Sequence, residues 1–301
     1  MAIQKEVWTK DIEEKLFANN EFIMSSVSHD AFVDNKTVHV PQAGSLPSVS
    51  VNRSSFPATI SQRTDTDLTY DLINFTSDPI LIRDLDALQV NYDKRMSVTS
   101  QQINKMNDRL GLEFLYRAAQ ATASVTTTGT AAASLNSPGA TGNRNGLILA
   151  DMASAASKLD GDDVPSQGRH MVIPYNVYWN FVNAEKASLL NLDYQGGLTE
   201  ADIQSGVVAK IYGFKIYVRS YTVVYDSAGA KKAIGAATAT TDDWGIVGWQ
   251  EDAVARAKGD IKVFIDEDKP EYYGSVYSNE INFAAKALRS DLKGIVTIQQ
   301  A

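Results

Sequence analysis

The sequence predicts an α+β protein, and three stretches carry this prediction. In "QRTDTDLTYDLINFTSDP", Leu68, Tyr70 and Leu72 alternate with polar residues, which is the period-two pattern of a strand with one apolar and one wet face. From 91 to 119, apolar residues recur every three or four positions, as they do on one face of a helix. Beyond Gly146 the pattern changes again, and short strands alternate with helices.

Composition excludes several classes of protein. The chain has 301 residues, with 28 Lys and Arg against 36 Asp and Glu, so its formal net charge is −8. A dedicated nucleic-acid reader is not expected, because phosphate binding rests on clustered Lys and Arg and the chain has no basic run. The absence of cysteine excludes disulfides, thiolate metal ligands and cysteine nucleophiles. Without a signal-peptide pattern or an apolar run of about eighteen residues, we expect a soluble protein made in a cytoplasm.

The first part of the chain is expected to contain an arm and a ribbon. The irregular amino-terminal arm holds one short expected helix at 11–19, and a β ribbon follows from 37 to 82. Pro41, Pro47 and Pro57 fall in the first half of the ribbon, where a missing N–H is tolerated at an edge or a bend. The ribbon is therefore expected to be edge-like and exposed.

A long helix is expected from Asn91 to Ala119, and it would be about 40 Å long at ~1.5 Å per residue. Asp84 precedes it as a plausible cap, and Arg109 and Glu113 are expected to pair one turn apart on its polar side. Its apolar stripe consists of Met96, Ile103, Met106, Leu110, Phe114 and Ala118.

The second half predicts a mixed α/β arrangement. A helix face at 148–159 is followed by the buried strand "RHMVIP" and by a helix that starts at Pro174. Another helix is expected to open at Thr199 and end at Gly213, before the strand "FKIYVRSYTVVY".

Two low-complexity stretches are expected to be loops, "SVTTTGTAAASLNSPGATGN" a flexible loop and "DSAGAKKAIGAATATTDD" a surface loop. Near the end, "QEDAVARAKG" predicts a short helix closed by Gly259, and the strands "IKVFID", "SVYSNEINFAAKAL" and "GIVTIQQ" complete the chain.

No catalytic, metal-binding or cofactor-binding residue is predicted. His29, His39 and His170 lie in three different local settings without ligand spacing, so each is expected to be structural. Asp65 and Asp67 lie on the alternating strand, where polar residues fill the wet face. The acidic cluster Asp160, Asp162 and Asp163 lacks the downstream glutamate of a calcium loop and is expected to be a solvated turn. Phosphate-binding, dinucleotide-binding and nucleophile-elbow glycine motifs are also missing from the sequence.

The ribbon is expected to need a partner surface. Ordering its roughly 45 residues costs ~1–2 kcal/mol each in backbone entropy, whereas burying an apolar side chain returns only ~1.5–3 kcal/mol. The ribbon therefore packs either on its own domain or across another copy of the chain. The candidate contacts between copies are Val49, Val51, Arg53, Phe56, Ile60, Arg63, Leu68, Tyr70, Leu72 and Phe75.

The order of these elements resembles the major capsid protein of tailed bacteriophages, the Hong Kong 97 type fold. The resemblance rests on the ribbon, the strand "DPILIRDL", the helix beginning near "NYDKRMSVTSQQ", and the phrases "RHMVIPYNVYWNFVNAE", "IYGFKIYVRS" and "DWGIVGWQEDAVARA". It implies an amino-terminal arm at 1–36, an extended β-hairpin loop at 37–82, a peripheral domain with a spine helix at 83–145, an axial α/β domain at 146–250, and a return to the peripheral sheet at 251–301.

The resemblance also implies a function and partners. Copies would assemble into hexamers and pentamers of an icosahedral virion shell around double-stranded DNA, with the extended loop resting on the next copy and no enzymatic turnover. A separate scaffolding protein, a portal and auxiliary or decoration proteins are the expected partners, and packaged DNA would be a non-specific neighbour. The chain has no lysine between Lys36 and Lys94, so the isopeptide bond that some family members form through this loop is excluded.

Two alternatives stay open. An encapsulin-like cellular compartment shell shares the resemblance. A monomeric hydrolase or sugar-modifying enzyme would use Asp65, Asp67 or the Asp160 cluster.

Overall fold

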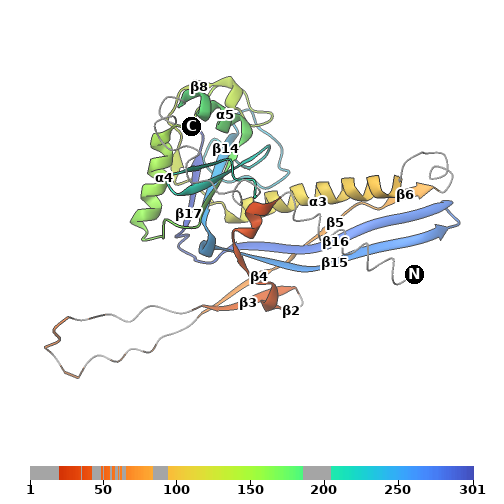
Figure 1. Cartoon of the computed structure of the whole chain (residues 1–301), viewed down its shortest axis with the longest axis horizontal. Coiled ribbons are helices and arrows are strands. Elements are labelled where there is room, and N and C mark those ends of the chain that lie inside the picture. Colours follow the sequence, from red (N-terminus) through yellow and green to blue (C-terminus); the bar gives the residue numbers. More distant parts are fainter. Residues whose placement is uncertain are drawn as a thin grey trace.

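The structure is a computed structural model and describes residues 20–34, 36–42, 66–83, 94–185 and 205–301, together with 49, 51–54, 56, 57, 60 and 62. Within this part the predicted α+β class is confirmed. One long helix runs along the five-stranded sheet and reaches the seven-stranded sheet, and a pair of strands projects beside them (Figure 1). The helix expected at 11–19 lies outside the described residues.

The first sheet is elongated and has five strands. Its centre is a long antiparallel hairpin of β15 (Val254–Lys269) and β16 (Gly274–Ala287). β1 (Val27–Ser28) pairs in parallel with the start of β15, whereas β5 (Ile73–Thr76) and β6 (Ile80–Arg83) pair with the other edge of β16. The strand predicted from "DPILIRDL" is thus confirmed as β6.

The second sheet has seven strands in the order β11-β12-β10-β14-β17-β7, with β13 also beside β14. Their bounds are β7 (Val125–Thr126), β10 (Arg169–Pro174), β11 (Ala209–Ile211), β12 (Phe214–Arg219), β13 (Val223–Tyr225), β14 (Asp243–Gln250) and β17 (Ile295–Gln299). Every residue of β10, β14 and β17 is buried, as expected for central strands that are covered on both faces.

The two faces of this sheet belong to different apolar cores. Ile246 lies in the core beneath α4 (Leu149–Gly161) and α5 (Tyr175–Ala184). The next residue, Val247, lies in the core that includes α3 (Lys94–Ala118). Because successive strand residues point to opposite faces, β14 serves both cores at once.

The long helix α3 joins the two sheets. Its predicted stripe is confirmed for Met106, Leu110, Phe114 and Ala118, which are all buried, while the side chains of Met96 and Ile103 lie outside the described part. Phe114 packs against Trp249 of β14, with 5.4 Å between ring centroids. The same core includes Val263 and Phe283 of the elongated sheet.

The predicted ion pair on this helix is wrong in its partner. The Glu113 carboxylate accepts from Arg117 at 2.9 Å, one turn later in the helix, instead of from Arg109.

Local sequence explains where α4 and α5 begin. Pro174 has a φ of −60°, and α5 starts directly after it, as predicted. At the start of α4, the Asp151 carboxylate accepts from the amide of Ile148 at 3.1 Å and from the hydroxyl of Thr128 at 2.6 Å. An acidic side chain is favourable there because it satisfies amides that have no partner within the helix.

The remaining elements are short. They are η1 (Glu21–Met24), η2 (Asp30–Phe32), β2 (Val33–Asp34), β3 (Thr37–Gln42), β4 (Thr66–Asp71), β8 (Ala131–Ala132), η3 (Ala133–Leu135), β9 (Arg144–Asn145) and η4 (Glu251–Ala253). The first low-complexity stretch is therefore more ordered than expected, since it contains β7, β8 and η3. Leu135 is fully buried, and the Thr127 hydroxyl donates to the carbonyl of Asn145 at 2.9 Å. The second stretch forms a mostly exposed connection between β13 and β14, as expected.

The helix expected from Thr199 to Gly213 is wrong where the structure describes it. β11 occupies its last part and pairs antiparallel with β12. Ala209 and Ile211 are buried at alternate positions, and Tyr212 and Gly213 have φ values of 48° and 82°. Two consecutive positive φ angles form the tight turn that joins the two strands.

The short helix expected to end at Gly259 is also wrong. Only η4 is helical, and β15 begins at Val254. Ala255 and Ala257 favour helices in isolation, but Ala257 pairs with Ala284 of β16 and both are buried. Pairing with a distant strand thus overrides local propensity.

Candidate assembly interface

The projecting element is a β-hairpin made of β3 and β4. The two strands pair antiparallel over their full length, from Thr37↔Asp71 to Gln42↔Thr66. β2 pairs only with the start of β3, so Pro41 lies where β3 has β4 as its single described neighbour. This position agrees with the edge-like character that the prolines predict.

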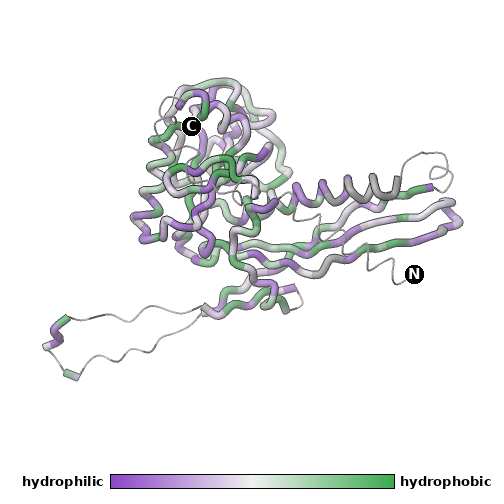
Figure 2. The backbone as a smooth tube through the Cα atoms, in the orientation of Figure 1, coloured by the Kyte–Doolittle hydropathy of each residue, from purple (hydrophilic) through white to green (hydrophobic). Residues whose placement is uncertain are grey.

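The described residues between β3 and β4 carry large apolar side chains in the open. Val49, Val51, Phe56 and Ile60 are 89%, 85%, 80% and 96% exposed. In Figures 1 and 2 the coloured segments between these strands lie far from both sheets, and some of them are hydrophobic. Arg53 is exposed among them, and Arg63 lies outside the described residues.

The base of the hairpin packs on the chain's own sheet. Tyr70 and Leu72 are buried in a small apolar cluster with Val38, Ala257 and Ala284. Leu68 is half-buried against the same cluster. Most of the apolar face of β4 is thus covered by this chain. Of the residues predicted to contact another copy, those in the outer part of the hairpin remain exposed.

The expected ribbon at 37–82 is divided between two places. Its last part forms β5 and β6, which belong to the elongated sheet and pair with β16. Phe75 is half-buried against the core beneath α3. The expectation that one ribbon extends to residue 82 is therefore wrong, because β16 supplies a pairing edge from far along the sequence.

A groove of about 350 Å³ runs between α3 and the segment of β5 and β6. Phe75 and Met106 give it apolar walls, and the exposed side chains of Asp78, Lys105 and Arg109 line it as well. Its size and lining are suitable for apolar side chains of another molecule.

Exposed aromatic side chains that were not predicted as contacts also occur at the β15–β16 turn and on α5. Tyr272 and Tyr273, at the turn between β15 and β16, are 53% and 80% exposed. Tyr175 and Trp179 of α5 are also exposed. Their spacing of four residues on a helix that starts after Pro174 indicates that both lie on one face, so the sequence alone could have predicted this aromatic pair.

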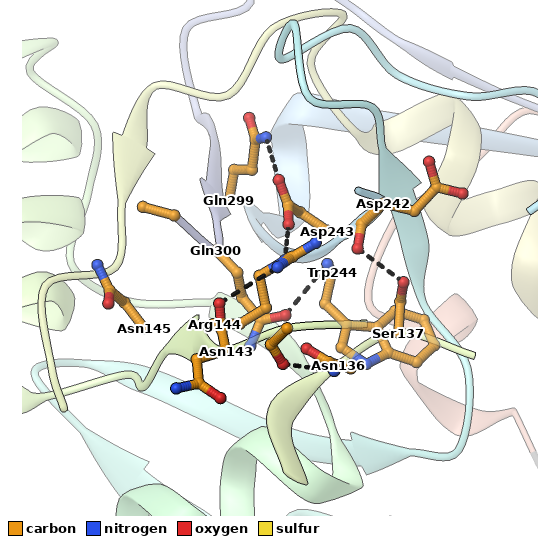
Figure 3. A network of polar contacts seen from close by, with 12 residues as sticks. Asn136, Ser137, Asn143, Arg144, Asn145, Asp242, Asp243, Trp244, Gln299 and Gln300 are labelled. Carbon is orange, nitrogen blue, oxygen red and sulfur yellow. Dashed lines mark hydrogen bonds and ion pairs between the residues drawn. The ribbon is translucent and has the colours of Figure 1, made fainter. Parts of the chain in front are cut away.

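A polar network joins the end of the second low-complexity stretch to β9 and β17 (Figure 3). Arg144 of β9 pairs with Asp243 of β14, which also accepts from Gln299 at 3.2 Å. The Lys232 ammonium lies 2.7 Å from the carboxylate of Asp242. Burial opposes ionisation of that carboxyl, yet the pKa of Asp242 is below its usual value because the Ala239 amide and Lys232 donate to it.

The histidines lie in separate polar contacts, as the sequence predicts. His29 Nδ1 is 3.1 Å from the Tyr70 hydroxyl, His39 pairs with Asp67 at 2.9 Å, and His170 lies 3.2 Å from the hydroxyl of Tyr217. In the described part of the chain, no group of three or more His, Asp or Glu side chains is arranged to hold a metal ion.

The acidic cluster is engaged in ion pairs at the end of α4. The Asp160 carboxylate lies 2.6 Å from the guanidinium of Arg169, and Asp162 lies 3.3 Å from the ammonium of Lys158. Asp65 lies outside the described residues. No described helix is both long and apolar enough to cross a bilayer.

The sequence matches no protein-family model and no curated protein sequence. Solved structures, in contrast, share its fold. The capsid of Cyanophage P-SCSP1u aligns with a TM-score of 0.62 and 19% identity over 91% of this chain and 85% of the other. A chain of Mycobacterium phage Che8 aligns with a TM-score of 0.56 and 16% identity over 95% and 90%. A virus-like particle from Pyrococcus furiosus aligns with a TM-score of 0.54 and 7% identity over 98% and 99%.

This chain therefore has the fold found in capsid proteins of tailed phages. The resemblance predicted from the order of elements is confirmed at the level of this α+β fold over almost the whole chain.

Proposed function

We propose that this chain is the major capsid protein of a tailed bacteriophage. Copies assemble into hexamers and pentamers, and these form an icosahedral shell around double-stranded DNA. The role is structural, without enzymatic turnover or a cofactor. The fold shared with phage capsids supports this proposal over nearly the full length of the chain.

The exposed outer part of the hairpin carries the proposal. A soluble monomer exposes single apolar residues without consequence, but four large ones on one projecting element indicate a surface that another molecule covers. Covering each of them returns ~1.5–3 kcal/mol. Another copy of the chain is the natural partner, because a head-to-tail contact that closes by rotation generates rings.

The parts of the chain have assigned roles in this proposal. Residues 37–82 include the loop that reaches over the neighbour, and 83–145 provide the peripheral domain with α3 as its spine. Residues 146–250 form most of the axial domain around the ring centre, whose sheet also includes β7 and β17, and β15 and β16 of the segment 251–301 return to the peripheral sheet. Residues 1–36 are the amino-terminal arm.

The expected partners follow from the same proposal. A separate scaffolding protein, a portal and auxiliary or decoration proteins act with the shell in the virion, after synthesis in the cytoplasm of the bacterial host. Packaged DNA is a non-specific neighbour, since a chain with a net charge of −8 is repelled by phosphate more than it is attracted.

Negative-stain microscopy and size-exclusion chromatography of the purified chain test the proposal, with and without a co-expressed scaffolding protein. Rings or closed shells are the expected result. A monodisperse 32.8 kDa monomer under every condition would contradict it.

A cellular compartment shell is the second candidate, and the likeness to the virus-like particle from Pyrococcus furiosus favours it. Particles purified from the native source distinguish the two. A phage capsid contains nuclease-protected DNA of genome length, and a compartment shell contains protein cargo.

A further inference from the structure

The base of the hairpin is joined to the elongated sheet by a small apolar contact. Val38, Tyr70 and Leu72 of the hairpin side meet Ala257 of β15 and Ala284 of β16. The sheet contributes only alanines to this cluster, so the apolar area that holds the junction is limited. Polar contacts at the same place therefore matter more than they would in a large core.

His29 spans this junction. Its amide donates to the carbonyl of Arg256 in β15 at 2.8 Å, and its Nδ1 lies 3.1 Å from the hydroxyl of Tyr70 in β4. The ring of Phe32 packs edge-on at 5.7 Å between centroids. The side chain of His29 is 4% exposed, so a charge on its ring would be poorly solvated.

The elements packed around the hairpin base carry several charged or titratable groups. They are Asp30 on η2, Tyr70 on β4, Arg256 and Lys258 on β15, and Lys286 on β16, whose ammonium donates to the carbonyl of Thr69. Of the charged groups, Asp30 acts on the His29 ring. The Asp30 carboxylate is held by the amide of Lys258 at 2.7 Å. Burial lowers the pKa of His29, and Asp30 opposes this effect only in part. Burial and Asp30 raise the pKa of Tyr70, so its hydroxyl keeps its proton.

We propose that His29 is a protonation-sensitive latch, which holds the hairpin base against β15 when neutral and releases it when protonated. An exposed imidazole has a pKa of about 6.5. Above this pH the His29 ring is neutral in both the latched and the released states, so the latch has its full strength. Below it, the released state takes up a proton that the buried ring resists. Release is then favoured by up to about tenfold per pH unit, until the latched ring is protonated as well.

The latch is a property of the single chain. It rests on the proposed function only in its consequence, which is that mild acid would free the hairpin to change its angle to the sheet. His39 offers a matched control, because it lies on the same hairpin, is exposed, and pairs with Asp67 across the two strands.

Hydrogen–deuterium exchange with mass spectrometry on the purified full-length chain tests the latch. The amides of His29 and Lys258 donate to Arg256 and Asp30 and join the segment that carries the His29 ring to β15, and their protection is compared at pH 7.5 and 5.5 in the wild type, His29→Gln and His39→Gln. At each pH the protection factor is divided by that of His29→Gln, which removes the intrinsic effect of pH on the exchange rate. Wild type and His39→Gln are expected to lose protection relative to His29→Gln at the lower pH, by up to about tenfold. Equal pH dependence in wild type and His29→Gln would overturn the proposal, and so would its loss in His39→Gln.

Exchange at the imidazole C2 position, measured in the wild type alone, gives the pKa of His29 directly and does not depend on a variant that folds. A value below the ordinary 6.5 is expected, and a value at or above it overturns the latch. Because both readouts report contacts within one chain, a failed latch and a failed shell proposal are separate results.

Discussion

Replacing Phe56 and Ile60 together by serine is expected to abolish self-association while the monomer stays folded. The two side chains are 80% and 96% exposed, so the free energy of unfolding is expected to change by less than ~0.5 kcal/mol. In the proposed assembly a neighbouring copy covers both, and each contributes ~1.5–3 kcal/mol. The two losses sum to about 3–6 kcal/mol per contact between copies, which weakens the association constant of that contact by roughly two to four orders of magnitude.

The assay is size-exclusion chromatography with light scattering over a concentration series, supported by negative-stain microscopy. Thermal unfolding followed by circular dichroism checks that the variant folds. Val208→Ser is the matched control, because Val208 is an apolar residue on the body that is 38% exposed. If the double variant assembles at the same concentration as the wild type, the hairpin is not the contact between copies and the reasoning fails.

Three further predictions concern stability, each measured by urea unfolding. Arg144→Ala is expected to lower the free energy of unfolding by about 3 kcal/mol, because it leaves the Asp243 carboxylate buried without its cation. Combining Arg144→Met with Asp243→Leu should recover most of the loss. An Arg144→Ala variant as stable as the wild type would contradict this. Burial, helped by nearby Arg117, lowers the pKa of Lys231 to about 8. Between this pKa and the ordinary lysine value of ~10.4, the unfolded chain binds more protons than the folded chain. The free energy of unfolding of the wild type should therefore rise relative to that of Lys231→Met from pH 7.5 to 9.5. Parallel curves for the two proteins would refute the assignment. Gly274→Ala is expected to cost ~1–3 kcal/mol, because its Cβ would collide with backbone of β6, and an unchanged midpoint would show that the strands can separate freely.

Elements whose signals are local were predictable from the sequence. The spacing of Met106, Leu110, Phe114 and Ala118 indicates a buried helical stripe, and each of these residues is buried. Pro174 marks the start of α5 because its fixed φ suits the first turn of a helix.

Elements decided by distant partners were not predictable. Ala255 and Ala257 favour a helix locally, and only β16 makes them part of a strand. The alternation at Tyr70 and Leu72 correctly indicated an apolar face, but it contained no information about Ala284, which covers that face. For the candidate interface, the sequence thus indicated an exposed ribbon without showing where its covered base ends.

The continuous core beneath α3 also decides how this chain carries force. Val263 of the elongated sheet and Trp249 of the seven-stranded sheet pack into that one core, so tension applied to either sheet reaches the other through close-packed side chains. A single molecule stretched between the two sheets is expected to rupture in one event. In the proposed shell, the bending that a curved wall requires must then occur outside this rigid unit.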